Sequence, residues 1–468
     1  MPIPARGPHR RAIGYLRERP YLVLLAIIVL AVVLRLGWIA YVNPDPNDGR
    51  ADDTLFYDHA ARSLADGLGY TNFLGAQTAQ WPPGYPLVLA VIYKVAGPHI
   101  LLPKLLNVLA GAATCLLVYA IGAKIFNRRV GLLGALLFAV FPGQIYFSTL
   151  IMTESIYPAL LCLLLFLFIL WVLEPEHPSL WGRLLLGVLF GAAILTRSEA
   201  GVLLLAALIV WKLATPSWRR FAGRSAPLVL AAVAAVAPWT VRNAITMHSF
   251  VPVVSGIGHT LLAGHQSDPY NPYHVFPEAK FQQQYKDLPF PQYEIKVEQA
   301  STREALKFII HHPHDELLVF PFEKLFHLYR DDADALSWVR GARLPSVPAP
   351  QIYSVAVEDR WAALANGYYW VIMLAAIAGI PLWFSIRDKK RLLIILLVVG
   401  WTAAHLLFLP TPRYHSPLTP LFALWAAVTA VAVFDAIARR RAPARSSVGP
   451  APDGEAESLQ ERNVDQSR

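Results

Sequence analysis

Residues 20–42 read PYLVLLAIIVLAVVLRLGWIAYV, an apolar run with one charge, Arg35. At about 1.5 Å per residue, a helix of this length crosses the roughly 30 Å hydrocarbon core of a bilayer. Similar blocks recur along the 468 residues, of which 55% are hydrophobic and 16% charged, below the roughly 25% charged residues of soluble domains. The sequence therefore predicts an all-α polytopic membrane protein and excludes a chain that is disordered throughout.

The apolar blocks divide the chain into ten predicted membrane spans. They lie near 20–42, 104–124, 130–148, 155–173, 182–197, 199–214, 225–243, 361–385, 392–409 and 415–437. The blocks at 182–197 and 199–214 are short for a helix that needs about 20 residues to cross. Eight or twelve spans remain alternatives, provided that the basic clusters between the blocks stay on one face.

The formal charge is +9, from 41 lysines and arginines against 32 aspartates and glutamates. Much of the excess lies in short runs between apolar blocks, so it indicates topology and we expect no nucleic-acid partner. With ten spans, five basic clusters fall on one face, which the positive-inside rule makes cytoplasmic. The clusters are Arg6, Arg10, Arg11, Arg17 and Arg19; Lys124, Arg128 and Arg129; Lys212, Arg219, Arg220 and Arg224; Arg387, Lys389, Lys390 and Arg391; and Arg439, Arg440 and Arg441.

This orientation predicts a multi-pass protein of the plasma (inner) membrane, with an uncleaved first span and both termini cytoplasmic. The predicted divisions are a cytoplasmic N-terminus (1–19), a transmembrane module (20–243) with an outer loop (43–103), a small extracytoplasmic α or α/β domain (244–360), C-terminal transmembrane helices (361–438) and a disordered cytoplasmic tail (439–468). A helix is expected near 294–311. Cys115 and Cys162 both lie in apolar blocks, which argues against a disulfide framework.

The outer loop carries the residues most suited to chemistry. Its stretch DDTLFYDHAARSL (52–64) has helical apolar spacing, which predicts an amphipathic helix on the outer membrane surface with Asp52 and Asp53 at its start. Carboxylates stabilise a helix N-terminus through the backbone dipole, which is one reading of this pair. The other is a general base or a metal ligand at the membrane surface. The following WPPGYP (81–86) predicts a rigid extended stretch that re-enters the membrane.

Several motifs, in order, extend this pattern along the chain. They are Asp53-x3-Tyr57-x3-Ala61-Arg62-x-Leu64-x2-Gly67-x-Gly69-Tyr70, Pro82-Pro83-x-Tyr85-Pro86, Ser148-x5-Glu154, Leu195-Thr196-Arg197, Pro238-Trp239-Thr240-Val241-Arg242-Asn243, Ala305-x3-Ile309-x3-Pro313 with Lys324, and Arg413-Tyr414-x2-Pro417-x2-Pro420. Together they resemble the GT-C membrane glycosyltransferases, in particular the protein mannosyltransferase and aminoarabinose-transferase branch, glycosyltransferase family 39. The resemblance covers roughly residues 20–435.

The resemblance implies the GT-C fold and a hexosyl- or pentosyltransferase of cell-envelope glycosylation. Its donor would be a sugar on polyprenyl phosphate, and its acceptor a lipid, glycan or protein outside the cytoplasm. It gives Asp53 the role of base, with Asp52 as support or substitute, because a carboxylate can take the proton of an attacking hydroxyl. Glu154 is a candidate metal ligand or arginine partner. The implied donor-phosphate contacts are Arg413, Arg197, Arg242 and Tyr414, and the implied substrate contacts are Tyr57, His59 and His415.

The sequence also departs from the family pattern. Gln80-Trp81 stands where aminoarabinose transferases carry a Glu-Lys whose lysine contacts lipid phosphate, so that contact is missing here. Thr54 takes the place of the second acidic residue after Asp53, and Gly264-His265-Gln266 replaces the usual Gly-Asn-Asn.

Two questions remain open at this level. No cofactor is certain, and a divalent metal is possible, although histidines such as His311, His312, His314 and His327 lack a completing ligand pattern and fit a solvated surface better. The alternative functions are a transporter or lipid flippase, and a catalytically silent scaffold. The transporter reading requires substrate-binding charges at mid-membrane and usually internal repeats, and we identify neither in the sequence.

Overall fold

The computed structural model describes residues 20–43, 52–265, 278–340 and 354–441. Predictions for residues 1–19 and 442–468 lie outside this range. Within it, the ordered elements are helices, with an isolated bridge between Thr71 and Gln77. The described part therefore confirms an all-α fold, and the outer domain is built from α-helices rather than α/β units wherever it is described.

Among the described residues, seven helices are long and apolar enough to cross a membrane. They are α2 (Pro20–Val42), α5 (Leu101–Ile125), α8 (Thr153–Phe168) continued by the π-helical η2 (Ile169–Leu173), α11 (Trp218–Thr246), α17 (Val355–Ala378), α19 (Lys389–Leu407), and η4 (Pro412–Leu418) continued by α20 (Thr419–Arg441). They correspond to seven of the ten predicted spans. Residues 439–441, predicted to be disordered, form the last turn of α20.

Two further predicted spans are shorter apolar helices, α9 (Leu180–Thr196) and α10 (Ala200–Ala214). The remaining prediction, one continuous span over 130–148, is wrong. This stretch forms α6 (Arg128–Ala139) and the short α7 (Pro142–Phe147), because Pro142 has no N–H to continue the helical ladder. At the break, the buried Arg35 donates from Nη1 to the carbonyl of Ala139 at 3.2 Å, which satisfies an acceptor that α6 leaves open.

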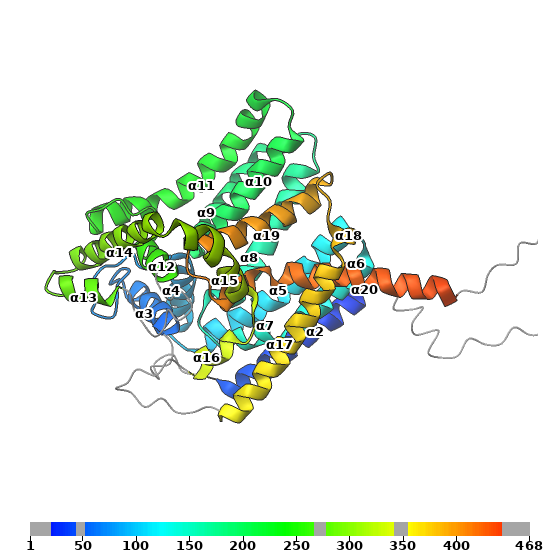
Figure 1. Cartoon of the computed structure of the whole chain (residues 1–468), viewed down its shortest axis with the longest axis horizontal. Coiled ribbons are helices and arrows are strands. Elements are labelled where there is room, and N and C mark those ends of the chain that lie inside the picture. Colours follow the sequence, from blue (N-terminus) through cyan, green and yellow to red (C-terminus); the bar gives the residue numbers. More distant parts are fainter. Residues whose placement is uncertain (1–19, 44–51, 266–277, 341–353, 442–468) are drawn as a thin grey trace, which may run out of the picture.

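The other helices form the outer region and one short turn. They are α3 (Asp52–Ala65), α4 (Gly84–Ala96), α12 (Ile257–Gly264), α13 (Ala279–Tyr285), α14 (Gln292–His311), the π-helical η3 (Asp315–Val319), α15 (Phe320–Tyr329), α16 (Asp334–Arg340) and, next to α17, α18 (Ile380–Trp383) (Figure 1). The helix expected near 294–311 is confirmed by α14. The extended stretch predicted over 81–86 is only partly correct, since α4 begins at Gly84, directly after the two prolines.

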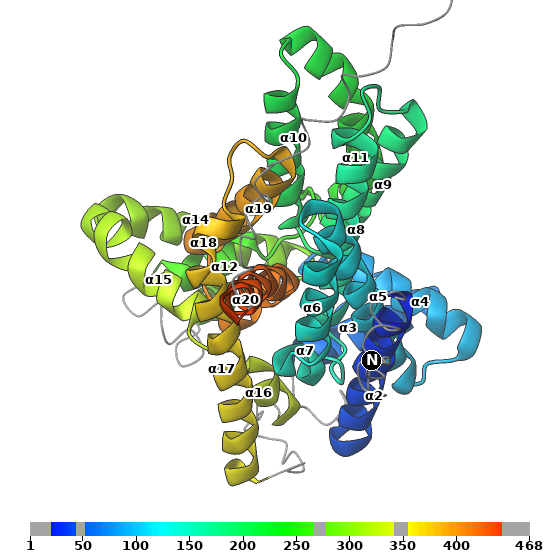
Figure 2. The same cartoon turned by 90° about the vertical axis from the view of Figure 1, so that its right-hand side faces the viewer.

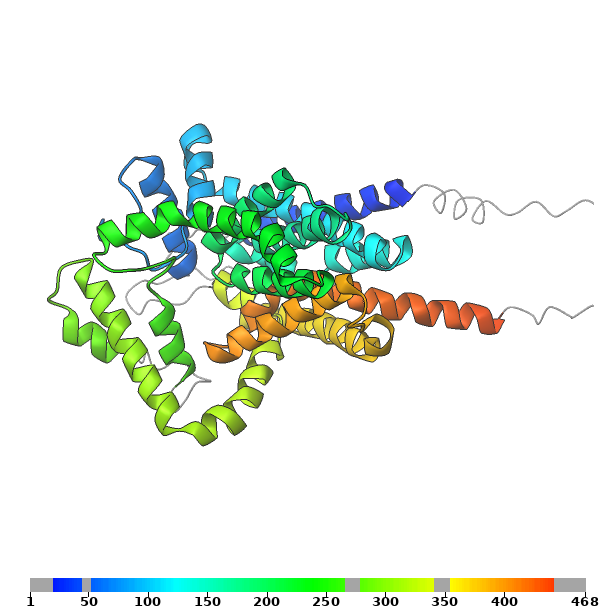
Figure 3. The ribbon, with the colours of Figure 1, turned by 90° about the horizontal axis from the view of Figure 1, so that it is seen from above.

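Acidic side chains join several of the predicted basic clusters in the described part of the chain. Glu174 binds Lys124 Nζ at 2.7 Å and Lys390 Nζ at 2.6 Å, and Arg129 pairs with Asp435 at 2.7 Å. In Figures 2 and 3 the N-terminal end of α2 and the C-terminal end of α20 lie at the same end of the bundle, and α3 and α12–α14 lie at the opposite end. The clusters that contain Lys124 and Arg129, Lys390, and the end of α20 therefore lie together, and the assignment of this face as cytoplasmic stays a prediction.

Candidate active site

An ion pair joins the first outer helix to the last span. Arg413 Nη1 of η4 lies 2.6 Å from Asp53 Oδ2 of α3, across 360 positions of sequence. The side chains of Arg413 and Asp53 are 12% and 17% exposed. The second carboxylate oxygen, Oδ1, accepts a hydrogen bond from Trp81 Nε1 at 3.3 Å. Both oxygens of Asp53 are thus engaged, yet the pair keeps access to solvent.

The indole of Trp81 is itself held in place. Its ring stacks on Phe56 with the centroids 3.9 Å apart, and the hydroxyl of Tyr70 donates to the carbonyl of Trp81 at 3.0 Å. Trp81 stands at one of the positions where the sequence departs from the family pattern. The structure shows that this departure brings an indole donor, which orients the Asp53 carboxylate. Sequence spacing alone contained no signal for this contact.

The helix that carries Asp53 is packed on more than one side. Phe56 and Ala60 are buried, as the predicted amphipathic pattern requires, but so are Tyr57 and Asp58 on a neighbouring face. Asp58 is bound by Arg62 Nε and by the hydroxyl of Tyr93, each at 2.6 Å. The helix is therefore confirmed, but α3 is enclosed by protein rather than laid on a surface with a single buried face. The side chain of Asp52 lies outside the described residues.

The guanidinium of Arg413 is surrounded by groups that the sequence reading did not predict. Its Cζ lies 4.5 Å from the ring centre of Trp338 and 5.2 Å from that of Tyr414, which suits a cation. Trp338 Nε1 donates to Asp334 Oδ2 at 3.0 Å. Burial raises the pKa of Asp334, and the charge of Arg413 opposes that rise. The acidic run Asp331-Asp332-x-Asp334 was the available signal for this part of the site.

A second ion pair lies deeper. Arg197 Nη1, at the end of α9, lies 3.1 Å from Glu154 Oε1 in the first turn of α8 and donates to Thr153 Oγ1 at 3.2 Å. Its Nη2 reaches Glu199 Oε1 at 3.3 Å. The side chains of Arg197 and Glu154 are only 8% and 3% exposed. Of the two roles predicted for Glu154, metal ligand or arginine partner, the structure shows the arginine contact.

Helix α4 packs closely against the end of α9, next to this second pair. A Cβ added at Gly84 would lie 2.6 Å from Thr196 Oγ1 and 2.8 Å from the carbonyl of Leu195. Such distances leave no space for a side chain, so glycine is required for the start of α4 to approach the end of α9. This requirement explains the glycine within the WPPGYP stretch.

Tyr57 lies within electrostatic range of both pairs. Burial, followed by the charges of Asp53 and Glu154, raises the pKa of Tyr57 well above its usual value. The charges of Arg197 and Arg413 act in the opposite direction. The predicted residues Asp53, Glu154, Arg413, Arg197 and Tyr57 therefore form one neighbourhood. A phenol held neutral there can donate a hydrogen bond to a phosphate or sugar oxygen.

Tyr414 connects the two arginines. Its ring centre is 5.2 Å from Cζ of Arg413 and 5.5 Å from Cζ of Arg197. The backbone carbonyl of Tyr414 accepts a hydrogen bond from Trp401 Nε1 at 2.8 Å, which fixes η4 against α19. Both predicted members of the Arg-Tyr motif thus face the same neighbourhood.

Two other predicted residues, Arg242 and His59, make different contacts. Arg242 donates to the carbonyls of Thr78 (2.7 Å) and Tyr70 (3.1 Å) and to the side chain of Gln77, which braces the outer loop. His59 Nε2 contacts the carbonyl of Asn72 at 2.8 Å in the same loop. These contacts favour a structural role for both side chains, while their predicted substrate contacts stay untested.

His415 is buried next to the motif arginine but points elsewhere. Its Nδ1 contacts the carbonyl of Leu328 at 2.7 Å, and its Nε2 lies 3.1 Å from Asp332 Oδ1. Its ring stacks on Tyr369 with the centroids 4.8 Å apart. His415 therefore ties η4 to α15, and its predicted substrate contact stays untested.

No group of three or more His, Cys, Asp or Glu side chains that could hold a metal ion occurs in the described ranges. His311 and His312 are exposed and contact backbone carbonyls of their own helix. The two carboxylates of the site are occupied by Arg413, Trp81 and Arg197 partners. The possible divalent metal therefore stays a prediction.

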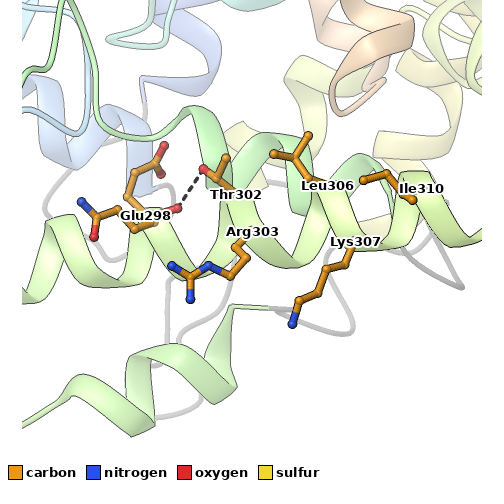
Figure 4. Close-up of a pocket in the computed structure, with 7 residues that line it drawn as sticks. Glu298, Thr302, Arg303, Leu306, Lys307 and Ile310 are labelled. Carbon is orange, nitrogen blue, oxygen red and sulfur yellow. Dashed lines mark hydrogen bonds between the residues drawn. The ribbon is translucent and has the colours of Figure 1, made fainter.

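A separate open pocket lies along one side of α14 (Figure 4). Its lining residues are Glu298, Gln299, Thr302, Arg303, Leu306, Lys307 and Ile310. Within the helix, Thr302 Oγ1 donates to the carbonyl of Glu298 at 2.9 Å. None of the residues of the two ion pairs contributes to this pocket, so it is distinct from the candidate site.

The first comparison with known proteins concerns sequence. Residues 80–241 match the family described as dolichyl-phosphate-mannose-protein mannosyltransferase. No curated protein matches the chain.

Solved structures provide the second comparison. The chain is similar to the Archaeoglobus fulgidus oligosaccharyltransferase AglB in complex with an inhibitory peptide and a dolichol-phosphate. The sequence identity is 13%, the TM-score is 0.52, and the match covers 92% of this chain and 52% of that one. For the same enzyme in complex with Zn and sulfate, the sequence identity is 14% and the TM-score is 0.50, and the match covers 89% of this chain and 50% of that one. For ArnT from Cupriavidus metallidurans bound to undecaprenyl phosphate, the sequence identity is 14% and the TM-score is 0.41, and the match covers 84% of this chain and 77% of that one.

The chain spans about half the length of the Archaeoglobus structures that it matches. At such low identity this likeness shows the fold alone. The fold, the family match over residues 80–241 and the motif order agree with one another. The resemblance to the GT-C superfamily predicted from the motifs is therefore confirmed, and the chain has the polytopic fold of these membrane glycosyltransferases.

Proposed function

We propose that the chain transfers a sugar from a polyprenyl-phosphate donor to a lipid, glycan or protein acceptor, with Asp53 as the base. The observation that carries this proposal is the contact between Asp53 and Arg413, which places a proton acceptor and a phosphate-binding cation 2.6 Å apart. The pair lies at the end of the bundle opposite the basic clusters, which supports an extracytoplasmic site.

In the proposed reaction, the acceptor hydroxyl attacks the anomeric carbon while its proton passes to Asp53. The bond from that carbon to the phosphate oxygen breaks, and polyprenyl phosphate leaves with the bonding electrons. Arg413 stabilises the charge that develops on the phosphate, and Arg197 and Tyr414 lie close enough to Arg413 to assist. A single displacement inverts the anomeric configuration, as the family's chemistry implies.

The ion pair also suggests an order of events. A donor phosphate would compete with Asp53 for Arg413, because both anions need the same guanidinium. Engagement of the donor would therefore release Asp53 Oδ2 for the acceptor hydroxyl, while Trp81 continues to hold Oδ1. The base would therefore become available only when a donor is present.

The comparisons support this chemistry at a general level. The matching family carries a dolichyl-phosphate-mannose description, and one similar Archaeoglobus structure contains a peptide and a dolichol-phosphate. We extend from them only the donor class, a sugar on polyprenyl phosphate. A hexose and a pentose are both compatible with this proposal.

The decisive experiment measures release of polyprenyl phosphate by the purified chain in lipid, supplied with polyprenyl-phosphate sugars and candidate acceptors. We expect Asp53→Asn to lower the rate by about 10²- to 10⁴-fold, the range of general-base catalysis. Asp66→Asn, an exposed aspartate just beyond the same helix, is the matched control and should keep the parent rate.

An unchanged rate in Asp53→Asn, with Asp52→Asn inactive, would move the role of base to Asp52. Unchanged rates in both variants would overturn the proposed chemistry. Movement of the donor across the bilayer without release would favour the transporter or flippase instead.

A further inference from the structure

The outer domain exposes a run of large apolar side chains on η3 and α15. Leu317 and Phe322 are 74% and 71% exposed, and Leu318, Leu325 and Phe326 are exposed as well. Leu318, Phe322, Leu325 and Phe326 follow helical spacing, so they share one face of the continuous η3–α15 segment. In a water-soluble helix this spacing would mark the buried face.

The opposite face of the same segment is buried and includes a charged side chain. Lys324 is 1% exposed and donates from Nζ to the carbonyl of Leu406 at 3.1 Å. Its Nζ also lies 3.3 Å from His265 Nε2, and His265 Nδ1 lies 2.7 Å from Glu316 Oε1. The segment therefore buries a lysine, together with Phe320 and Leu328, and turns a set of large apolar groups outward. This arrangement is favourable against lipid and costly against water.

Contacts with a membrane-spanning helix set the depth of this segment. The hydroxyl of Tyr329, at the end of α15, lies 2.6 Å from Thr402 Oγ1 of α19. Thr402 is five residues before the end of α19 at Leu407, or about 7.5 Å along its axis. The end of α15 is thus level with the last turns of α19, which expose Val399 and Leu407 on their own surface.

We propose that η3 and α15 lie in the bilayer leaflet on the side of α3, with the face formed by Leu318, Phe322, Leu325 and Phe326 against lipid. The occupant of this face is lipid because the face continues the apolar surface of α19. The inference does not depend on the proposed function.

The placement connects the lipid phase to the candidate site. Leu328 of α15 contacts His415 through its backbone carbonyl, and His415 lies two residues after Arg413. A displacement of α15 in the bilayer would therefore act on the segment that positions Arg413. The membrane-facing segment and the phosphate-binding arginine form one packed unit.

The test uses the full chain in phosphatidylcholine nanodiscs, with an environment-sensitive fluorophore on Phe322→Cys. The native Cys115 and Cys162 are buried, which keeps background labelling low. We expect emission shifted to shorter wavelength and a loss of intensity when some lipids carry a nitroxide on the acyl chain. Gln283→Cys on the polar, exposed α13 is the control, and iodide in the aqueous phase should quench it instead.

Phe326→Cys provides a second position on the same face if Phe322→Cys is poorly folded. Iodide quenching at both positions, equal to that at Gln283→Cys, would overturn the proposal. A short-wavelength emission that neither quencher changes would also overturn it, since it would indicate that protein, such as a second copy of this chain, covers the face.

Discussion

The two ion pairs of the outer region have the same chemistry but different surroundings. The pair of Asp53 and Arg413 is 17% and 12% exposed, and each oxygen of Asp53 has one donor. The pair of Glu154 and Arg197 is 3% and 8% exposed, and Arg197 is shared with Glu199. The first pair therefore keeps more contact with solvent, whereas the second is buried between α8 and α9.

This difference separates two functions of charge in a membrane protein. A buried charge that loses its partner costs more than an exposed one, because no water replaces the partner. We therefore infer that the buried pair mainly holds helices together and that the accessible pair mainly serves substrate. Substitutions in the buried pair should therefore change mainly stability, and substitutions at the accessible pair should change mainly the transfer rate.

The largest effect is expected from removal of the buried cation. Arg197→Met leaves Glu154 buried without its partner and should lower the free energy of unfolding by about 3–5 kcal/mol. Thermal unfolding in detergent measures this loss. The double variant Glu154→Leu/Arg197→Met should be less destabilised than the single one, because it removes the uncompensated charge. A single variant of unchanged stability would show that the pair is not structural.

A smaller effect on stability, but a large one on rate, is expected at the accessible pair. Arg413→Gln removes a donor to the developing phosphate charge and should lower the transfer rate by about 10²- to 10³-fold, with the unfolding temperature nearly unchanged. Steady-state release of polyprenyl phosphate measures the rate. Arg303→Gln, on the exposed side of α14, is the control. Equal losses of stability in Arg413→Gln and Arg197→Met would remove the distinction between the pairs.

An intermediate effect is expected at the indole donor. Trp81→Phe retains a ring to stack on Phe56 but loses the hydrogen bond to Asp53 Oδ1, worth about 1 kcal/mol. The transfer rate should fall by about tenfold or less, chiefly in kcat, because the carboxylate is less well oriented. Trp81→Leu, which also loses the stacking, should be slower still. A rate equal to the parent in Trp81→Phe would show that Trp81 only packs.

The smallest effect is the influence of the Asp53 charge on the pKa of His259. Burial alone would lower the pKa of His259, but the hydrogen bond and charge of Glu278, with Glu298 and Asp53, raise it above its usual value. Asp53→Asn should therefore lower the pKa of His259, and Glu154→Gln should not. Histidine-labelled NMR titration, assigned with His259→Gln, measures both shifts. Equal shifts in the two variants would contradict the separation of the pairs.

The raised pKa of His259 also makes the stability of the folded chain depend on pH. A histidine that binds its proton more tightly in the folded state stabilises the fold fully below its unfolded pKa, about 6.5. This contribution disappears as the pH rises through the folded value. In Asp53→Asn the folded pKa of His259 falls, so its stabilising contribution should disappear at a lower pH than in the parent. The free energy of unfolding, measured at several pH values, will show this change.

Much of the fold could be predicted because apolar length is a local property. Seven of the ten expected spans coincide with helices long enough to cross a bilayer. The failure at 130–148 comes from Pro142, whose missing N–H divides an otherwise apolar block. The start of α4 at Gly84 was missed since two prolines suggested an extended chain, although proline also fits the first turn of a helix.

The sequence by itself determined the membrane class, the helix that begins at Asp52, and the residue types suited to a phosphate-linked donor, because composition, period and motif order are written along the chain. Only the tertiary structure decided which arginine meets which carboxylate, that Trp81 orients Asp53, that Arg242 and His415 brace other segments, and that α15 turns its apolar side outward. The physical reason is that ion pairs and exposed faces depend on how helices far apart in sequence pack, and no local pattern encodes that packing.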